Sequence, residues 1–113
     1  MNTKDIYLVD LNPTKGAETK KARPCIIVSN DDVGILPLKV IIPLIGHKSI
    51  HDNKSWLVPI VATTQNGLAK TSTADALNMR SVSDTRIIKK IGVISDETYV
   101  KLLDSMKIVL NMV

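Results

Sequence analysis

The chain divides into short apolar runs separated by turn residues, and this spacing restricts its fold more than any other feature. Residues 5–10, 24–29, 38–45 and 56–61 are rich in Val, Ile and Leu, and each run has at most eight residues. Runs of this length and composition predict strands. Turn chemistry separates them, as in Asn-Pro-Thr-Lys-Gly at residues 12–16. We therefore expect several short strands.

The last third of the chain contains two further strand patterns and one helix pattern. Residues 75–82 and 86–93 predict strands, whereas the polar, glycine-containing stretch at 63–73 predicts a mobile loop. Ser95 is a good helix N-cap, and two acids follow it. Beyond it, apolar residues recur at intervals of three and four, which predicts a helix with one buried face: Tyr99, Leu102, Leu103, Met106, Val109 and Leu110.

These elements predict an α+β fold that is mostly β: a small antiparallel barrel or curled sheet with a C-terminal helix. A chain of 113 residues is long enough for one hydrophobic core and too short for two, so we expect a single domain over residues 1–113. The strand at 24–29 is apolar on both faces and should be central in the sheet. Pro43 is expected near an edge or a bulge.

Positive charge is concentrated between the first two expected strands. Lys15, Lys20, Lys21 and Arg23 face a single acid there, Glu18, so this segment carries most of the net charge of +4. Clustered cations favour an anionic partner, most often nucleic acid, because binding releases counterions. A solvated loop without a ligand explains the charge equally well.

Composition excludes several other classes of protein. No apolar run approaches the roughly 20 residues that span a bilayer, and the acidic N-terminal segment does not resemble a signal peptide, so we expect a cytoplasmic protein. Cys25 is the only cysteine, which rules out an internal disulfide and favours a buried apolar role. His47 and His51 would align only on a helix, which their surroundings disfavour, so we expect no metal site and no cofactor.

Residues 5–30, DIYLVDLNPTKGAETKKARPCIIVSN, resemble the N-terminal signature of the MazF/PemK toxin family. The shared features are a strand ending in an acid, Pro-Thr-Lys-Gly, a Glu, and Arg-Pro opening a β-branched strand. Residues 79–92, MRSVSDTRIIKKIG, are similar to the family's second block. The resemblance spans nearly the whole chain. It implies a small SH3-like barrel that forms a homodimer, cleaves single-stranded RNA without a metal and pairs with a cognate antitoxin.

The resemblance assigns the family's catalytic arginine to Arg23. A guanidinium can bind a phosphate through two parallel hydrogen bonds and offset the charge that develops during cleavage. Glu18 occupies the position of the family's loop glutamate, where it could orient Arg23 or accept a proton. The structural alternative is an ion pair between these two residues.

The chain departs from the family pattern after the third strand, where a catalytic Thr or Ser is common and this chain has Ile45. His47 and Ser49 could reach the same space if the loop folds back, and they complete our set of candidate catalytic residues. An imidazole can accept a proton at neutral pH. In the later block Leu77 replaces an acid, and Ala17 stands where some members carry a histidine.

RNA contacts are expected from the cationic loop and the residues around it. Trp56, beside a polar loop, is the candidate surface for base stacking, with a core position as the alternative. Arg80 could also serve a surface or dimer ion pair. The full set of candidate RNA-binding residues is Lys15, Gly16, Thr19, Lys20, Lys21, Trp56 and Arg80.

The implied reaction is sequence-specific cleavage in which the ribose 2′-hydroxyl attacks its own phosphate, so only RNA is a substrate. Two alternatives stay open. A non-catalytic toxin of the same fold could poison a protein such as DNA gyrase, as the related CcdB group does, and Ile45 favours this. A degenerate member could retain only dimerisation and antitoxin binding.

Overall fold

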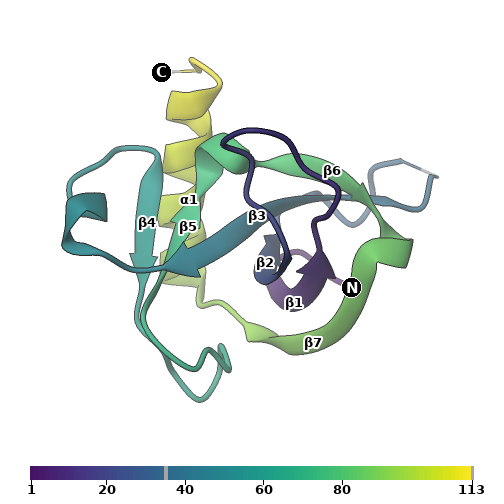
Figure 1. Cartoon of the computed structure of the whole chain (residues 1–113), viewed down its shortest axis with the longest axis horizontal. Coiled ribbons are helices and arrows are strands. Elements are labelled where there is room, and N and C mark those ends of the chain that lie inside the picture. Colours follow the sequence, from purple (N-terminus) through teal and green to yellow (C-terminus); the bar gives the residue numbers. More distant parts are fainter. Residues whose placement is uncertain (35, 113) are drawn as a thin grey trace.

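The structure is a computed structural model that describes residues 1–34 and 36–112. Seven strands precede one α-helix, and three 3-10 turns connect some of them (Figure 1). In chain order the elements are β1 (Asp5–Asp10), β2 (Ala22–Ile27), β3 (Leu38–Gly46), η1 (Ser49–His51), β4 (Leu57–Ile60), β5 (Ser72–Asp75), η2 (Ala76–Asn78), β6 (Arg80–Ser83), η3 (Asp84–Arg86), β7 (Ile87–Val93) and α1 (Asp96–Val109).

The strands form one antiparallel sheet in the order β4-β5-β3-β2-β1-β7, with β6 also paired to β3. The mostly-β fold with a C-terminal helix is thus confirmed. Strand β2 lies between β1 and β3 and its residues 25–27 are fully buried, which confirms its central position. It begins two residues earlier than predicted, so Arg23 lies within the strand, opposite Val9 of β1.

The sheet is curled but does not close into a barrel, so the barrel alternative was wrong. In the described residues the end strands β4 and β7 do not pair with each other. The segment between β4 and β5 packs against β7 instead, and Val93 donates its backbone N–H to the carbonyl of Gln65 at 3.1 Å. Gly67 permits this approach: its φ is +66°, and a Cβ there would lie 2.2 Å from the Ile91 carbonyl oxygen.

The predicted loop at 63–73 is wrong at its C-terminal end, because Ser72 and Thr73 begin β5. Much of the remainder is exposed, but Asn66 and Leu68 are buried and hold the segment on the sheet. Asn66 is buried, and its side-chain oxygen accepts hydrogen bonds from the backbone N–H groups of Thr63 and Leu68. Polar composition suggested a solvated segment, but an asparagine that satisfies its own neighbours can fold such a segment onto the sheet.

The predicted strand at 75–82 is two strands separated by a 3-10 turn. Leu44 of β3 pairs with Ala74 of β5, and Ile41 of β3 pairs with Arg80 of β6. An advance of three residues along β3 therefore corresponds to an advance of six residues from β5 to β6. Turn η2 contains the surplus residues. Pro43 lies between the part of β3 that pairs with β5 and the part that pairs with β6. Proline has no N–H, and at this position neither pairing loses a backbone hydrogen bond.

Both faces of the sheet are covered. One face carries Ile26, Ile42 and Ala74 and packs in a core cluster with Leu102 of α1. Because side chains alternate along strands, the residues between these belong to the other face. That second face has its own apolar cluster of Val9, Leu11, Cys25, Ile27, Ile41 and Val82.

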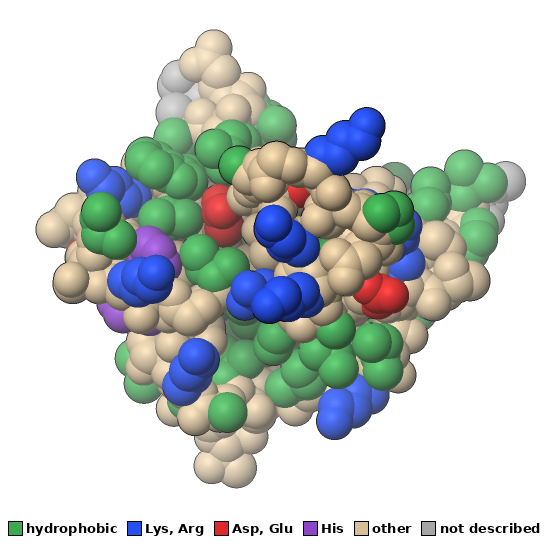
Figure 2. Space-filling view, viewed as in Figure 1, with side chains coloured by type: hydrophobic (Ala, Val, Ile, Leu, Met, Phe, Trp, Pro, Cys, Tyr) green, Lys and Arg blue, Asp and Glu red, His purple; other side chains and the backbone are tan. Residues whose placement is uncertain are grey.

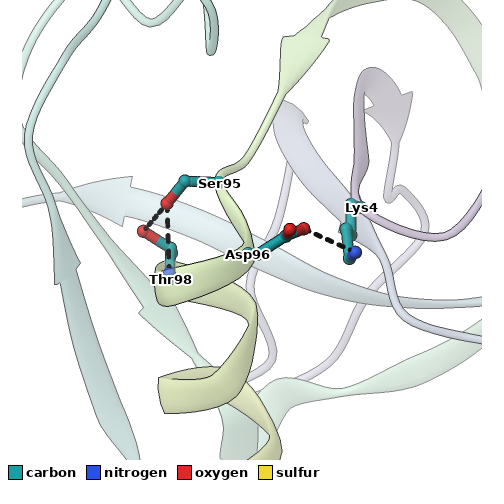
Figure 3. A network of polar contacts seen from close by, with 4 residues as sticks. All are labelled: Lys4, Ser95, Asp96 and Thr98. Atoms are coloured by element: carbon teal, nitrogen blue, oxygen red, sulfur yellow. Dashed lines mark hydrogen bonds and ion pairs between the residues drawn. The ribbon is translucent and has the colours of Figure 1, made fainter.

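Helix α1 begins where the sequence predicted, and side chains close its first turn (Figure 3). The Ser95 hydroxyl accepts a hydrogen bond from the Thr98 N–H at 3.1 Å, and Asp96 pairs with Lys4 at 2.7 Å. This contact with the lysine lowers the pKa of Asp96. Of the predicted apolar face, Leu110 lies beyond the helix and is exposed. In the described residues no helix is long and apolar enough to cross a membrane.

Replacing Ser95 with alanine should lower the free energy of unfolding by about 1 kcal/mol, because the Thr98 N–H loses its acceptor. Urea denaturation measures this difference. Ser49→Ala is the matched control, since the exposed Ser49 begins a 3-10 turn without acting as its cap, and it should change stability by less than about 0.5 kcal/mol. Equal stability of the Ser95→Ala protein and the parent would contradict the capping role.

Candidate active site

Two arginines hold the base of the β1–β2 loop. Arg80 Nη1 donates to the carbonyl of Leu11 at 3.2 Å, and Arg86 Nη1 donates to the carbonyls of Asp10 and Asn12. Arg80 was expected to contact RNA or an ion-pair partner, but its visible contact is with the loop backbone. Arg86 was missed by sequence reasoning, because nothing in its pattern shows that η3 turns it toward the loop.

A second anchor holds the far side of this loop. Asn78 in η2 accepts a hydrogen bond from the Thr19 N–H at 3.1 Å and donates to the Asp75 carboxylate at 2.7 Å. Thr19, a candidate RNA contact, therefore has its backbone fixed to the sheet. The extra residues of η2 allow this contact, because they bring Asn78 out of the strand register.

The cationic side chains of the loop remain exposed, although its backbone is held. Lys15, Lys20 and Lys21 make no ion pair with any residue that the structure describes. Gly16 has a φ of +56° and open space around it. Glu18 accepts a hydrogen bond from the Lys15 N–H at 2.5 Å, so it shapes the turn that presents the lysines.

Arg23 is half-buried and keeps most of its hydrogen-bonding capacity. Its Nε donates to the Lys20 carbonyl at 3.1 Å, which fixes the side chain. Its terminal nitrogens have no hydrogen bond or ion pair to any described residue, so the alternative pairing with Glu18 is absent there. A guanidinium held through Nε with free Nη groups can bind an anion through two hydrogen bonds.

Cys25 lies beneath this arginine in the second core cluster and is fully buried. Burial raises the pKa of its thiol to about 12, and the positive charges of Arg80 and Arg23 oppose that shift. Strand register places both arginines on the face of this thiol, since Arg23 is two positions before Cys25 in β2 and Arg80 pairs with Ile41 of β3.

Four residues from two segments form a polar cluster at the end of β3. The Nδ1 atoms of His47 and His51 each lie 2.9 Å from the hydroxyl of Thr73, a residue that is fully buried in β5. His47 Nε2 lies 3.3 Å from the Asp52 carboxylate. The loop after β3 therefore folds back, as the candidate role of His47 requires. His51 and Thr73 were not among the candidate catalytic residues, because no sequence pattern indicates that β5 passes the end of β3.

Ser49 and Trp56 belong to the segment that follows β3: Ser49 lies between His47 and His51, and Trp56 follows Asp52. Ser49 is exposed in η1. The Trp56 side chain is 37% exposed, and the residue belongs to neither core cluster, so a stacking role stays open to it. Ile45 pairs with Thr73, which places a threonine hydroxyl beside the position where the family pattern has one.

The loop cations and the histidines share one face of the molecule. Figure 2 shows several Lys and Arg side chains near the centre of this face, over the β1–β2 loop, and the histidine side chains at its left. Strand alternation agrees with the picture, since Arg23, Ile45 and Thr73 all belong to the face of the second core cluster.

Comparison with known proteins decides the family. A family model described as PemK-like, MazF-like toxin of type II toxin-antitoxin system matches residues 2–110. The chain belongs to this toxin family. A relative named Endoribonuclease MazF9, from Mycobacterium tuberculosis, is 27% identical over 115 residues, and the match covers 99% of this chain and 98% of the relative. This PemK-like toxin is thus homologous to a protein named as an endoribonuclease.

Solved structures with this fold include MazF from Deinococcus radiodurans, with a TM-score of 0.82, 15% identity, and coverage of 99% of this chain and 97% of that one. A mycobacterial endoribonuclease in complex with its cognate antitoxin has a TM-score of 0.76 at 17% identity, with coverage of 100% and 97%. At these identities the likeness shows that the PemK-like toxin shares their fold.

The buried thiol should be protected from modification. A pKa of about 12 against an ordinary 9.0 keeps Cys25 protonated at pH 8 and lowers its reactive thiolate fraction by roughly a thousandfold. We expect a thiol reagent to label the folded toxin at least about 100-fold more slowly than the protein in denaturant. Similar labelling rates in the two states would show that the thiol is accessible.

The Asn78 anchor should govern the motion of the loop. Asn78→Ala removes the acceptor of the Thr19 N–H, so exchange of that amide with deuterium should accelerate roughly three- to tenfold. Amide exchange followed by NMR measures the rate. Leu77→Ala is the matched control, because that neighbouring side chain is exposed and it should leave the rate unchanged. A Thr19 amide that exchanges at the same rate in the Asn78→Ala toxin would contradict the anchor.

Proposed function

We propose that this toxin is a metal-independent, sequence-specific endoribonuclease that cleaves single-stranded RNA in the cytoplasm. Membership of the family and homology to a named endoribonuclease support the activity. The observation that carries the proposal is Arg23: its Nε is held by the Lys20 carbonyl, and its Nη groups have no partner in the described residues. The structural arginines Arg80 and Arg86 differ in this respect, because each directs a terminal nitrogen to a backbone carbonyl.

The chemistry begins at the ribose 2′-hydroxyl. Its oxygen attacks the adjacent phosphorus while its proton passes to the exposed carboxylate of Glu18. The bond from phosphorus to the 5′-oxygen then breaks, its electron pair goes to that oxygen, and the oxygen takes a proton from an acid of the site or from water. The products are a 2′,3′-cyclic phosphate and a 5′-hydroxyl. Arg23 binds the non-bridging oxygens and stabilises the charge that builds on them in the transition state. His47 and Ser49 supply polar groups near the leaving oxygen.

RNA binding depends mainly on charge. Lys15, Lys20 and Lys21 contact neighbouring phosphates from an exposed loop, and Trp56 stacks on a base. The positive φ of Gly16 forms part of the turn that presents these lysines. Arg80 acts indirectly by holding the loop at Leu11.

The toxin pairs with a cognate antitoxin and forms a homodimer. Related structures support the first point, since a mycobacterial endoribonuclease and the MazF of Deinococcus radiodurans were each solved with an antitoxin or MazE. The exposed apolar side chains of the described chain, among them Val33, Leu36 and Leu38, are suitable for protein contacts of this kind.

Arg23→Ala should reduce cleavage about 100- to 1,000-fold, because the transition state loses its two-point hydrogen bonding. Arg23→Lys should restore only a minor part, since a lysine cannot bind in a bidentate manner. The assay incubates purified toxin with mixed single-stranded RNA and a chelator, and maps the cut ends. Lys107→Ala removes one exposed charge from α1 and should cleave at the parent rate.

Two results would count against this function. The first is cleavage by the Arg23→Ala toxin at the parent rate. The second is intact RNA at high concentrations of the parent toxin together with growth arrest in cells, which would favour poisoning of a protein target. Ile45, which has no hydroxyl, is the feature that would explain that second result.

A further inference from the structure

The buried Thr73 hydroxyl joins two imidazoles, and it can donate only one hydrogen. Its oxygen lies 2.9 Å from Nδ1 of His47 and 2.9 Å from Nδ1 of His51. Since a hydroxyl has one proton and two lone pairs, it can donate to at most one of the two rings. At least one of the histidines therefore carries a proton on Nδ1 when both contacts are made.

The neighbouring groups decide the direction. The Lys48 N–H donates to His51 Nδ1 at 3.2 Å, so this nitrogen has no proton, and Thr73 must donate to it as well. Thr73 then accepts a proton from His47 Nδ1. His47 Nε2 lies 3.3 Å from the Asp52 carboxylate, which can accept a proton from it. The hydrogen-bond partners thus assign a proton to His47 Nδ1 and none to His51 Nδ1, so the proton of a neutral His51 is on Nε2. With a second proton on Nε2, facing Asp52, His47 is the charged ring of the pair and can supply a proton to the other.

We propose that Asp52, His47, Thr73 and His51 form a proton relay that ends at His51 Nε2, which serves as the general acid for the leaving 5′-oxygen. The proposal rests on the proposed RNA cleavage. His51 Nε2 has no partner among the described residues, and the ring is half-buried, so it can reach a ligand. His51 is the catalytic residue, and Thr73 and His47 are positioning residues that act through it.

The proton transfers balance along the relay. As the phosphorus–oxygen bond breaks, its electron pair goes to the 5′-oxygen, which takes the proton from His51 Nε2. His51 Nδ1 then takes the hydroxyl proton of Thr73, and Thr73 takes the Nδ1 proton of His47. His47 ends neutral, with its remaining proton on Nε2 toward Asp52. The Lys48 N–H favours the starting state, because it opposes a proton on His51 Nδ1.

The place of the relay in the sheet fits this role. Thr73 is the direct partner of Ile45, the position at which the hydroxyl of the family pattern is missing. It lies on the same face as Arg23 by strand alternation, and Figure 2 shows the histidines and the loop cations on one face. One RNA strand across this face can therefore meet the guanidinium and the relay together.

The test uses an RNA cleaved by the parent toxin, in normal form and with sulfur replacing the leaving 5′-oxygen. Sulfur leaves without a proton, so it removes the need for an acid. Thr73→Val keeps the side-chain volume and His51→Gln keeps a polar group. Each should lower kcat on normal RNA about 100-fold or more with KM within about twofold. Both variants should approach the parent rate on the sulfur substrate, whereas Arg23→Ala should not.

Thr71→Val is the matched control, because the Thr71 hydroxyl has no partner among the described residues and lies two positions from Thr73. It should leave both rates unchanged. The relay is wrong if Thr73→Val and His51→Gln cleave normal RNA at the parent rate, or lose equal activity on both substrates. If the parent toxin cleaves neither RNA, the proposed function as an endoribonuclease is itself wrong.

Imidazole NMR tests the relay without catalysis. The nitrogen shifts at neutral pH should show a charged His47 and a neutral His51 protonated on Nε2, and Thr73→Val should shift the Nδ1 signals of both rings because each loses its contact with the hydroxyl. Two histidines with the same mixture of neutral forms in the parent would overturn the proposal. Because His51 is partly exposed, the His51→Gln variant keeps the kinetic test valid if Thr73→Val fails to fold.

Discussion

The backbone pairing of β3 is the constraint on which the rest of the structure depends. This strand pairs with β2, β5 and β6, so its buried polar groups are satisfied by three partners. The pairing with β2 sets the position of Arg23, and the pairing with β5 brings Thr73 to the end of β3. The surplus residues opposite β3 form η2, which carries Asn78 to the loop. One ladder thus positions both halves of the candidate site.

The candidate site combines a β1–β2 loop whose backbone is held by hydrogen bonds with cationic side chains that remain exposed. Arg80 and Arg86 each donate hydrogen bonds from Nη1 to loop carbonyls, whereas Arg23 donates only from Nε. The same residue type therefore has two roles that geometry separates: two guanidinium groups fix the loop, and one remains open to an anion. A loop that is already ordered loses less conformational entropy when it binds RNA, which favours rapid and specific contacts.

Local patterns predicted the elements whose signal lies within a few residues. The cap at Ser95, the helix period after it and the buried strand before Ser29 needed no tertiary information. The strand β5, the contact of the 63–71 segment with β7 and the open edge of the sheet depend on partners distant in sequence, so composition mispredicted them. For the same reason the sequence indicated Arg23 and His47 but not Thr73, whose role depends on contacts with residues more than twenty positions away.

In the proposed reaction a 2′-hydroxyl attacks a phosphate held by Arg23. The most direct measurement replaces the single ribose before the mapped cleavage site with 2′-deoxyribose and follows cutting in the presence of a chelator. We predict that cutting at that site stops while other sites in the same RNA continue to yield 2′,3′-cyclic phosphate ends. Continued cleavage at the deoxy position would contradict the account.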